Sequence, residues 1–196
     1  MSADVDDPVR ASLERFVGKP LGPPEEGGEP RLAPEAVNGP MIRHWVDAFD
    51  DRNPVYENET TASEGRFGGV VAPPAMLQTW TMPRPKIQGI EARGGAPDDM
   101  TFDNPVSALD EAGYVGALAT NSELEFERYL KPGDHLRSIN VIESISDQKM
   151  TGLGKGYFVT WVTTYTDQDG EVVGRQLFRV LKFDPSTIPG LGGDTK

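Results

Sequence analysis

Pro73-Pro74-Ala75-Met76-Leu77-Gln78-Thr79-Trp80-Thr81 is the stretch that decides the fold. A proline at the first helical position suits a helix start, because the N–H that it lacks has no acceptor there, and we expect the helix to stop by Pro83. Its residues are apolar or small almost all round. Other elements should therefore wrap this helix on most sides.

Strands should follow this helix. Residues 122–129 alternate, with Leu124 and Phe126 on one face and glutamates on the other. The next predicted strands are residues 136–145, residues 157–166 (both faces partly covered) and residues 172–183, with turns at 131–134 and 167–170. One apolar helix and a run of antiparallel strands predict an α+β domain, a curved sheet around the helix. Its open edge should be closed by a second copy, so we expect dimerisation.

The part before this helix divides into three pieces. Residues 8–17 have helical spacing of apolar residues, and residues 18–34 form a Pro/Gly/Glu-rich connector. Asn38 or Gly39 can cap a second helix with a buried stripe of Ile42, Trp45, Val46 and Phe49. The sequence Asp50-Asp51-Arg52-Asn53-Pro54 should end it, because a residue before proline is pushed out of the helical region. We divide the chain into residues 1–34, a domain at 35–184 with an insertion near 83–105, and a tail at 185–196, and we expect a helical turn or two within 108–116.

Composition excludes several classes of function. The chain has 196 residues and a net charge of -12, which repels nucleic-acid phosphates and anionic bilayers. It has no cysteine, so disulfides and thiolate chemistry are excluded. His44 and His135 give no metal-binding spacing. No apolar run reaches the length of a membrane helix, and the N-terminus is acidic where a signal peptide is basic, so we expect a cytoplasmic protein.

Several segments, taken in order, resemble the MaoC-like hydratases of the hot-dog fold, most closely the large subunit of the actinobacterial steroid side-chain enoyl-CoA hydratase. The resemblance covers roughly residues 35–184. It is carried by Met41-Ile42-Arg43-His44-Trp45-Val46, Asp51-Arg52-Asn53-Pro54, Val71-Ala72-Pro73-Pro74-Ala75-Met76, Gln78-Thr79-Trp80-Thr81-Met82, Asp110-Glu111-Ala112-Gly113-Tyr114, Ala119-Thr120-Asn121, Tyr129-Leu130-Lys131-Pro132-Gly133 and Leu181-Lys182-Phe183.

The resemblance implies a subunit of a heteromer. Its partner would be a small hot-dog subunit that carries a catalytic Asp/His pair, in an α2β2 heterotetramer, and the substrate would be a steroid acyl-CoA of cholesterol or steroid side-chain degradation. No further cofactor is expected, because the substrate carries CoA. The family's large subunit continues into a C-terminal domain that contacts a thiolase-like aldolase, whereas this sequence stops after one domain. Either it is a trimmed form or it lacks that contact.

The resemblance also locates a degenerate half-site. Asp51 matches the aspartate that orients water, but Tyr56 stands at the histidine position, and a phenol with a pKa near 10 is a poor base at neutral pH. Pro73-Pro74 replaces His-Gly, so the glycine N–H that helps to hold the enolate oxygen is missing. Losing one such donor raises the activation barrier by on the order of 3 kcal/mol, and losing the acid/base lowers the rate by ~10²–10⁴-fold.

We therefore expect no catalytic residue in this chain. Asp51, Asn53, Tyr56, Pro73, Pro74 and Trp80 are predicted substrate contacts, although Asp51 and Asn53 also suit an ordinary turn and Trp80 also suits the core. The sequence does not identify the residues that bind the CoA phosphates; Arg128 and Lys131 lie near a strand end. Two other functions stay open at this point: a self-sufficient homodimeric hydratase or thioesterase using Asp51 and Tyr56, and a non-enzymatic acyl-CoA binding module.

Overall fold

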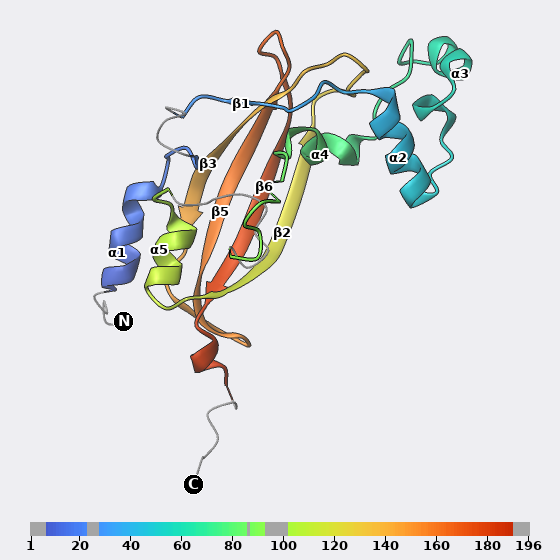
Figure 1. The fold of residues 1–196 in the computed structure, drawn as a ribbon. Helices are drawn as coiled ribbons and strands as arrows, with labels where there is room; N and C mark the ends of the chain where they lie inside the picture. The colour runs from blue at the N-terminus through green and yellow to red at the C-terminus, as the bar shows by residue number, and fades with distance from the viewer. Residues whose placement is uncertain (1–6, 23–27, 86, 93–101, 190–196) are drawn as a thin grey trace.

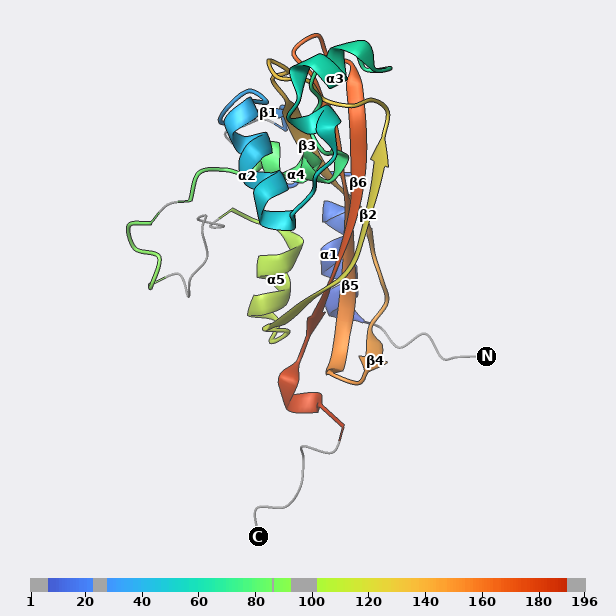
Figure 2. The same ribbon diagram turned by 90° about the vertical axis from the view of Figure 1, so that its right-hand side faces the viewer.

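The protein is an antiparallel sheet with its helices on one face, as a computed structural model of the chain shows (Figures 1 and 2). The structure describes residues 7–22, 28–85, 87–92 and 102–189. Residues 86 and 93–101 of the predicted insertion and residues 190–196 of the predicted tail lie outside these ranges. The α+β prediction is confirmed.

The sheet is formed by long strands that follow the helical half of the chain. Its order is β1-β3-β5-β6-β2, with β4 paired to β5. The strands are β1 (Arg31–Leu32), β2 (Gly116–Phe126), β3 (Arg137–Ile145), β4 (Lys149–Thr151), β5 (Gly154–Thr166) and β6 (Val172–Phe183). Three of the four predicted strands are close to these bounds, but β2 begins six residues before the predicted start. It is an edge strand with mostly exposed side chains, so the alternation that defines a half-buried strand is weak there.

The helical elements are short. They are α1 (Pro8–Leu13), η1 (Glu14–Phe16), α2 (Gly39–Phe49), η3 (Pro54–Tyr56), α3 (Glu59–Glu64), η4 (Pro74–Met76), α4 (Leu77–Thr81), α5 (Pro105–Glu111) and η5 (Pro185–Thr187). Asn38 caps α2 as expected, accepting from the Met41 N–H. The polar segment that contains α3 gave no helical signal, because α3 buries only Ala62.

One prediction for α2 is wrong, and another holds for a different reason. The helix ends at Phe49, immediately before the Asp50–Pro54 stretch predicted to end it, but Asp50 and not Asn53 stops it: Asp50 adopts the left-handed conformation at φ 50° and the next N–H, of Asp51, turns back to the Val46 carbonyl. Phe49 is not buried: it is 66% exposed and stacks on Trp45, with ring centroids 4.6 Å apart. The helix lies beside one end of the sheet, so its last turn has little to pack against (Figure 1).

The predicted central helix exists, but it is only partly wrapped. It consists of η4 and α4 and stops before Pro83 as predicted. Met76, Leu77 and Trp80 are buried against the sheet, whereas Ala75 and Gln78 are exposed. Gly174 of β6 permits the close approach, since a Cβ there would lie 2.7 Å from the Leu77 side chain. The described part of the chain covers this helix on one side only.

Two hydrophobic clusters cover the two ends of the same sheet face. One contains the central helix, the interior of α2 and Tyr56, and the other contains Leu13 and Phe16 from the N-terminal helices and Leu109 of α5, packed on Tyr157 and Val159. Figure 2 shows α2, α4 and α5 on one side of the sheet. The central helix is too short to fill the space between the two clusters.

The two edges of the sheet differ. The β3 edge is covered by the chain's own N-terminal segment, in which the Gly18 and Leu21 N–H groups donate to the carbonyls of Ile142 and Asn140, and by β1. Strand β2 pairs with β6 on one side, and within the described residues no strand pairs with its other side. The molecule therefore has one long strand edge to offer to a partner.

Candidate functional site

The turn after α2 lies beside the start of the central helix. The Val71 N–H donates to the Val55 carbonyl at 3.2 Å, which places the segment before Pro73 beside the turn that carries Tyr56. Tyr56, Val71, Met76 and Trp80 belong to one hydrophobic cluster. Two segments that are separate in the sequence thus form one half-site.

Asp51 and Asn53 shape the turn. The Asp51 carboxylate accepts from the Asn53 N–H at 3.0 Å, and the Asn53 side-chain oxygen accepts from the Val55 N–H at 3.3 Å. These are the bonds of ordinary Asx turns. Both residues therefore have a structural role in this turn, whatever they contact in a complex.

Tyr56 is buried, and its environment opposes ionisation. Burial raises the pKa of the Tyr56 phenol above its ordinary value of 10.0, the neighbouring Asp51 and Tyr129 raise this pKa further, and a hydrogen bond from Asn53 lowers it. The phenol is consequently protonated at neutral pH. A protonated phenol cannot accept a proton from water as the histidine of a hydratase does.

The start of the central helix lacks amide donors. Pro73 precedes the first turn and Pro74 begins it, so Ala75 supplies the first N–H of the element. A developing oxyanion beside Pro74 would have no donor from that residue. Trp80, one helical element further on, is 5% exposed, and its indole N–H has no partner among the described residues.

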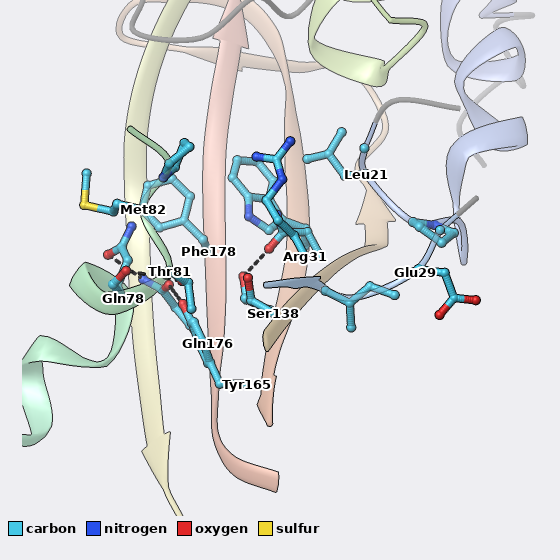
Figure 3. Close-up of a pocket in the computed structure, with 18 of the residues that line it drawn as sticks. Leu21, Glu29, Arg31, Gln78, Thr81, Met82, Ser138, Tyr165, Gln176 and Phe178 are labelled. Carbon is cyan, nitrogen blue, oxygen red and sulfur yellow. Dashed lines mark hydrogen bonds between the residues drawn. The ribbon is translucent and has the colours of Figure 1, made fainter. Parts of the chain in front are cut away.

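The structure also has a cavity of about 300 Å³ that does not include this half-site. Figure 3 shows the residues that line it. None of the six residues predicted from the sequence lines it. Its walls come from the end of the central helix, from the segment before β1, and from the helix-covered face of β3, β5 and β6. They include Leu21, Gln78, Thr81, Met82, Ser138, Asn140, Trp161, Thr163, Tyr165, Gln176 and Phe178. The volume is at the lower end of the range for small-molecule sites, about 300–1,000 Å³.

A buried polar network lies at the cavity floor. Gln176 is 2% exposed; its side-chain carbonyl accepts from the Tyr165 hydroxyl at 2.8 Å, and its NH₂ donates to Gln78 at 3.2 Å and to Ser122 at 2.9 Å. Burial raises the pKa of Tyr165 to about 12, so its hydroxyl remains a donor. Sequence analysis missed this network. Polar residues on the covered face of β5 and β6 were its only signal, and the pairing register was needed to bring them together.

Arg128 is not free to bind phosphate. Its guanidinium donates to Asp134 at 2.7 Å and to Asp167 at 2.7 Å. The hydrogen bond from Arg128 holds the pKa of Asp167 below its ordinary value, and the N–H groups of Glu171 and Asp169 act in the same direction against the effect of burial. Two carboxylates thus compensate one cation, which ties the strand end to the 167–170 turn.

The described residues contain no group of three or more metal-ligating side chains that could hold an ion. No helix among them is long and apolar enough to cross a bilayer.

Comparisons with known proteins agree with this geometry. A family model described as "FAS1-like, dehydratase domain region" matches residues 31–176. The chain is 44% identical over 181 residues to a probable enoyl-CoA hydratase alpha subunit of Thermomonospora curvata, covering 88% of this chain and 51% of the relative. It is 38% identical over 161 residues to a 3-oxo-4,17-pregnadiene-20-carboxyl-CoA hydratase alpha subunit of Mycobacterium tuberculosis, covering 82% and 49%. The chain thus spans about half the length of these curated relatives.

Solved structures show the same fold. The crystal structure of the ChsH1–ChsH2 complex from Mycobacterium tuberculosis contains a chain with a TM-score of 0.75 and 32% identity, covering 96% of this chain and 98% of that one. A MaoC-like dehydratase from Rhodospirillum rubrum matches with a TM-score of 0.52 and 21% identity, covering 80% and 92%, which shows the fold alone. The predicted hot-dog fold is confirmed.

Proposed function

This chain belongs to the MaoC-like hot-dog hydratase family, and from that premise we propose that it is the substrate-binding, non-catalytic subunit of a heteromeric enoyl-CoA hydratase. The observation that carries the proposal is the half-site itself: a buried, protonated phenol and a prolyl nitrogen stand at the positions that the family resemblance assigns to the base and to the donor. The relatives named as alpha subunits support an assembly with a second kind of subunit.

The reaction adds water across the double bond of an α,β-unsaturated thioester. A base takes one proton from water, the hydroxide adds to the β-carbon, and the resulting enolate is protonated at the α-carbon. Amide donors stabilise the enolate oxygen while it carries charge. We propose that a small hot-dog subunit with an Asp/His pair supplies these groups, and that this chain binds and orients the acyl group.

The free edge of β2 is where we place that subunit. Its backbone groups are unpaired within the described residues, and Leu118 and Phe126 on the same strand are 48% and 45% exposed. An exposed strand of this length is a template for pairing with another strand. The exposed side of the central helix, at Ala75 and Gln78, would be covered by the same partner. We propose an α2β2 assembly of two such pairs.

We propose a steroid side-chain acyl-CoA as the substrate. The support is the relative whose name specifies a pregnadiene-carboxyl-CoA, together with a cavity beyond the end of a central helix whose α-helical part, α4, is only five residues long. The test is hydration of a steroid enoyl-CoA by this chain alone, by its partner alone and by both together. The proposal predicts full turnover only for the pair. Turnover by the isolated chain that Asp51→Ala abolishes would favour a self-sufficient enzyme instead, and tight binding without turnover in any combination would favour a binding module.

A further inference from the structure

The floor of the cavity consists of two rows of side chains with different chemistry. Asn140, Thr163 and Gln176 are cross-strand neighbours on β3, β5 and β6, and form a polar row. Trp161 and Phe178 are paired on β5 and β6 beside it, with ring centroids 5.1 Å apart. A ligand on this floor would therefore meet a flat aromatic surface next to a line of hydrogen-bonding groups.

Most of the polar row is already satisfied. Both N–H groups and the carbonyl of the Gln176 side chain are used by Gln78, Ser122 and Tyr165, as described above. Thr163 is 6% exposed, and its hydroxyl donates to the Asn140 side-chain oxygen at 2.6 Å. An amide has two N–H donors besides its oxygen. The Asn140 NH₂ has no partner among the described residues, and it is the donor that the row leaves to a ligand.

The rest of the cavity favours an uncharged ligand. Its lining contains one acidic residue, Glu29, and one basic residue, Arg31, so the two charges cancel and the lining has no net charge. Leu21, Met82 and Ile139 add apolar surface to the walls. A fixed amide donor in such surroundings recognises a neutral acceptor, of which a ketone oxygen is the simplest.

We propose that the cavity binds the ring end of the substrate distal to the thioester, with the ring body on Trp161 and Phe178 and a ring ketone accepting from the Asn140 NH₂. The orientation rests on the proposed function, because Pro74 marks the thioester end of the central helix. Thr81 and Met82, which line the cavity, belong to the other end of the same element. The eight residues of η4 and α4 span roughly 13 Å, from ~2.0 Å and ~1.5 Å of rise per residue. Thr163 is a positioning residue, since its hydroxyl holds the Asn140 oxygen and turns the NH₂ toward the cavity.

The experiment compares two uncharged ligands on the chain purified with its partner: a four-ring ketone without a CoA group, and the same ring system with the ketone replaced by a methylene. Calorimetry should show that the wild-type assembly binds the ketone about five- to tenfold more tightly, the value of one neutral hydrogen bond. Asn140→Leu should abolish this difference and keep the affinity for the methylene compound within about twofold. Thr163→Val should reduce the difference in affinity. Ser144→Ala, at an exposed site on β3, the strand that carries Asn140, should leave the difference intact.

The outcomes separate this inference from the proposed function. Equal binding of the two ligands by the wild-type assembly, or a ketone preference that survives in Asn140→Leu, would overturn the ketone site. No binding of either ring system would overturn the cavity as the ring site. Hydration activity of the same preparation is measured independently, and its absence would count against the proposed function without bearing on the ligand preference. Circular dichroism of each variant shows that the fold is intact.

Discussion

The Tyr165 hydroxyl donates to the Gln176 side-chain oxygen at 2.8 Å, across two neighbouring strands and beneath the central helix. Because Gln176 is 2% exposed and also bonds Gln78 and Ser122, one side chain links α4, β2, β5 and β6. A buried network of this kind is stabilising only while every member is satisfied.

Replacing Gln176 should therefore be costly. We expect Gln176→Met to lower the free energy of unfolding by about 1–3 kcal/mol, because it leaves the Tyr165 hydroxyl without its acceptor. Tyr165→Phe should cost less, since the remaining groups keep other partners. Urea unfolding of the two single variants and the double variant measures the coupling. Costs that simply add would show that the two side chains do not act as a unit.

Alkaline pH should destabilise the protein through Tyr165. Burial raises the pKa of Tyr165 to about 12, whereas the unfolded chain has a value near 10. The contribution is fully present below pH 10 and is lost as the pH rises from 10 toward 12, because the unfolded state releases its proton first. Stability measured against pH should fall less steeply in this window for Tyr165→Phe than for the wild type. Equal slopes would mean that Tyr165 titrates normally in the folded protein.

Acid pH should destabilise the protein through Asp167, whose pKa is shifted down where that of Tyr165 is shifted up. The hydrogen bond from Arg128 lowers the pKa of Asp167 in the folded protein. The ionised carboxylate therefore stabilises the fold at any pH above its pKa in the unfolded chain, near 4, and this stabilisation is lost as the pH falls through the lower pKa of the folded protein. Asp167→Asn should lower stability at pH 7 and flatten the dependence below about pH 4. Asp169→Asn, in the same turn, is the control. An unchanged acid slope in Asp167→Asn would contradict the role of this ion pair.

Restoring the histidine alone should not restore chemistry. Tyr56→His supplies a group with a pKa near neutrality, yet Pro74 still offers no N–H to the enolate oxygen. We expect no hydration of enoyl-CoA above the background rate when the purified variant is assayed without a partner. Measurable turnover by Tyr56→His would show that the missing donor at Pro74 is dispensable.

Most of the fold could be predicted from the sequence, because the local sequence signals agreed with the tertiary contacts. Pro73-Pro74 and Pro83 bounded the central helix, and the alternation in β5 and β6 gave their bounds within three residues. The prediction that Phe49 is buried was wrong, because spacing alone does not show whether another element covers a helix turn. The left-handed Asp50 likewise has no clear sequence signal, since glycine is the usual residue there.

The site was less predictable than the fold. Tyr56 and Pro74 were each placed from one motif, because Tyr56 closely follows, and Pro74 stands in, a segment that carries the family resemblance. The row of Asn140, Thr163 and Gln176 depends on the register of three strands, and a shift of one residue would turn all three to the other face. Local patterns do not fix that register.

The central claim is that this chain performs no proton transfer, and it is tested most directly in the assembled enzyme. The measurement is kcat for hydration of a steroid enoyl-CoA by the complex that contains the Asp51→Asn, Tyr56→Phe double variant, followed by the loss of the unsaturated thioester's ultraviolet absorbance. We predict a kcat within about twofold of the wild-type complex, because neither group takes part in the chemical step. A decrease of about 10²-fold or more, the usual cost of removing a catalytic acid or base, would contradict the account.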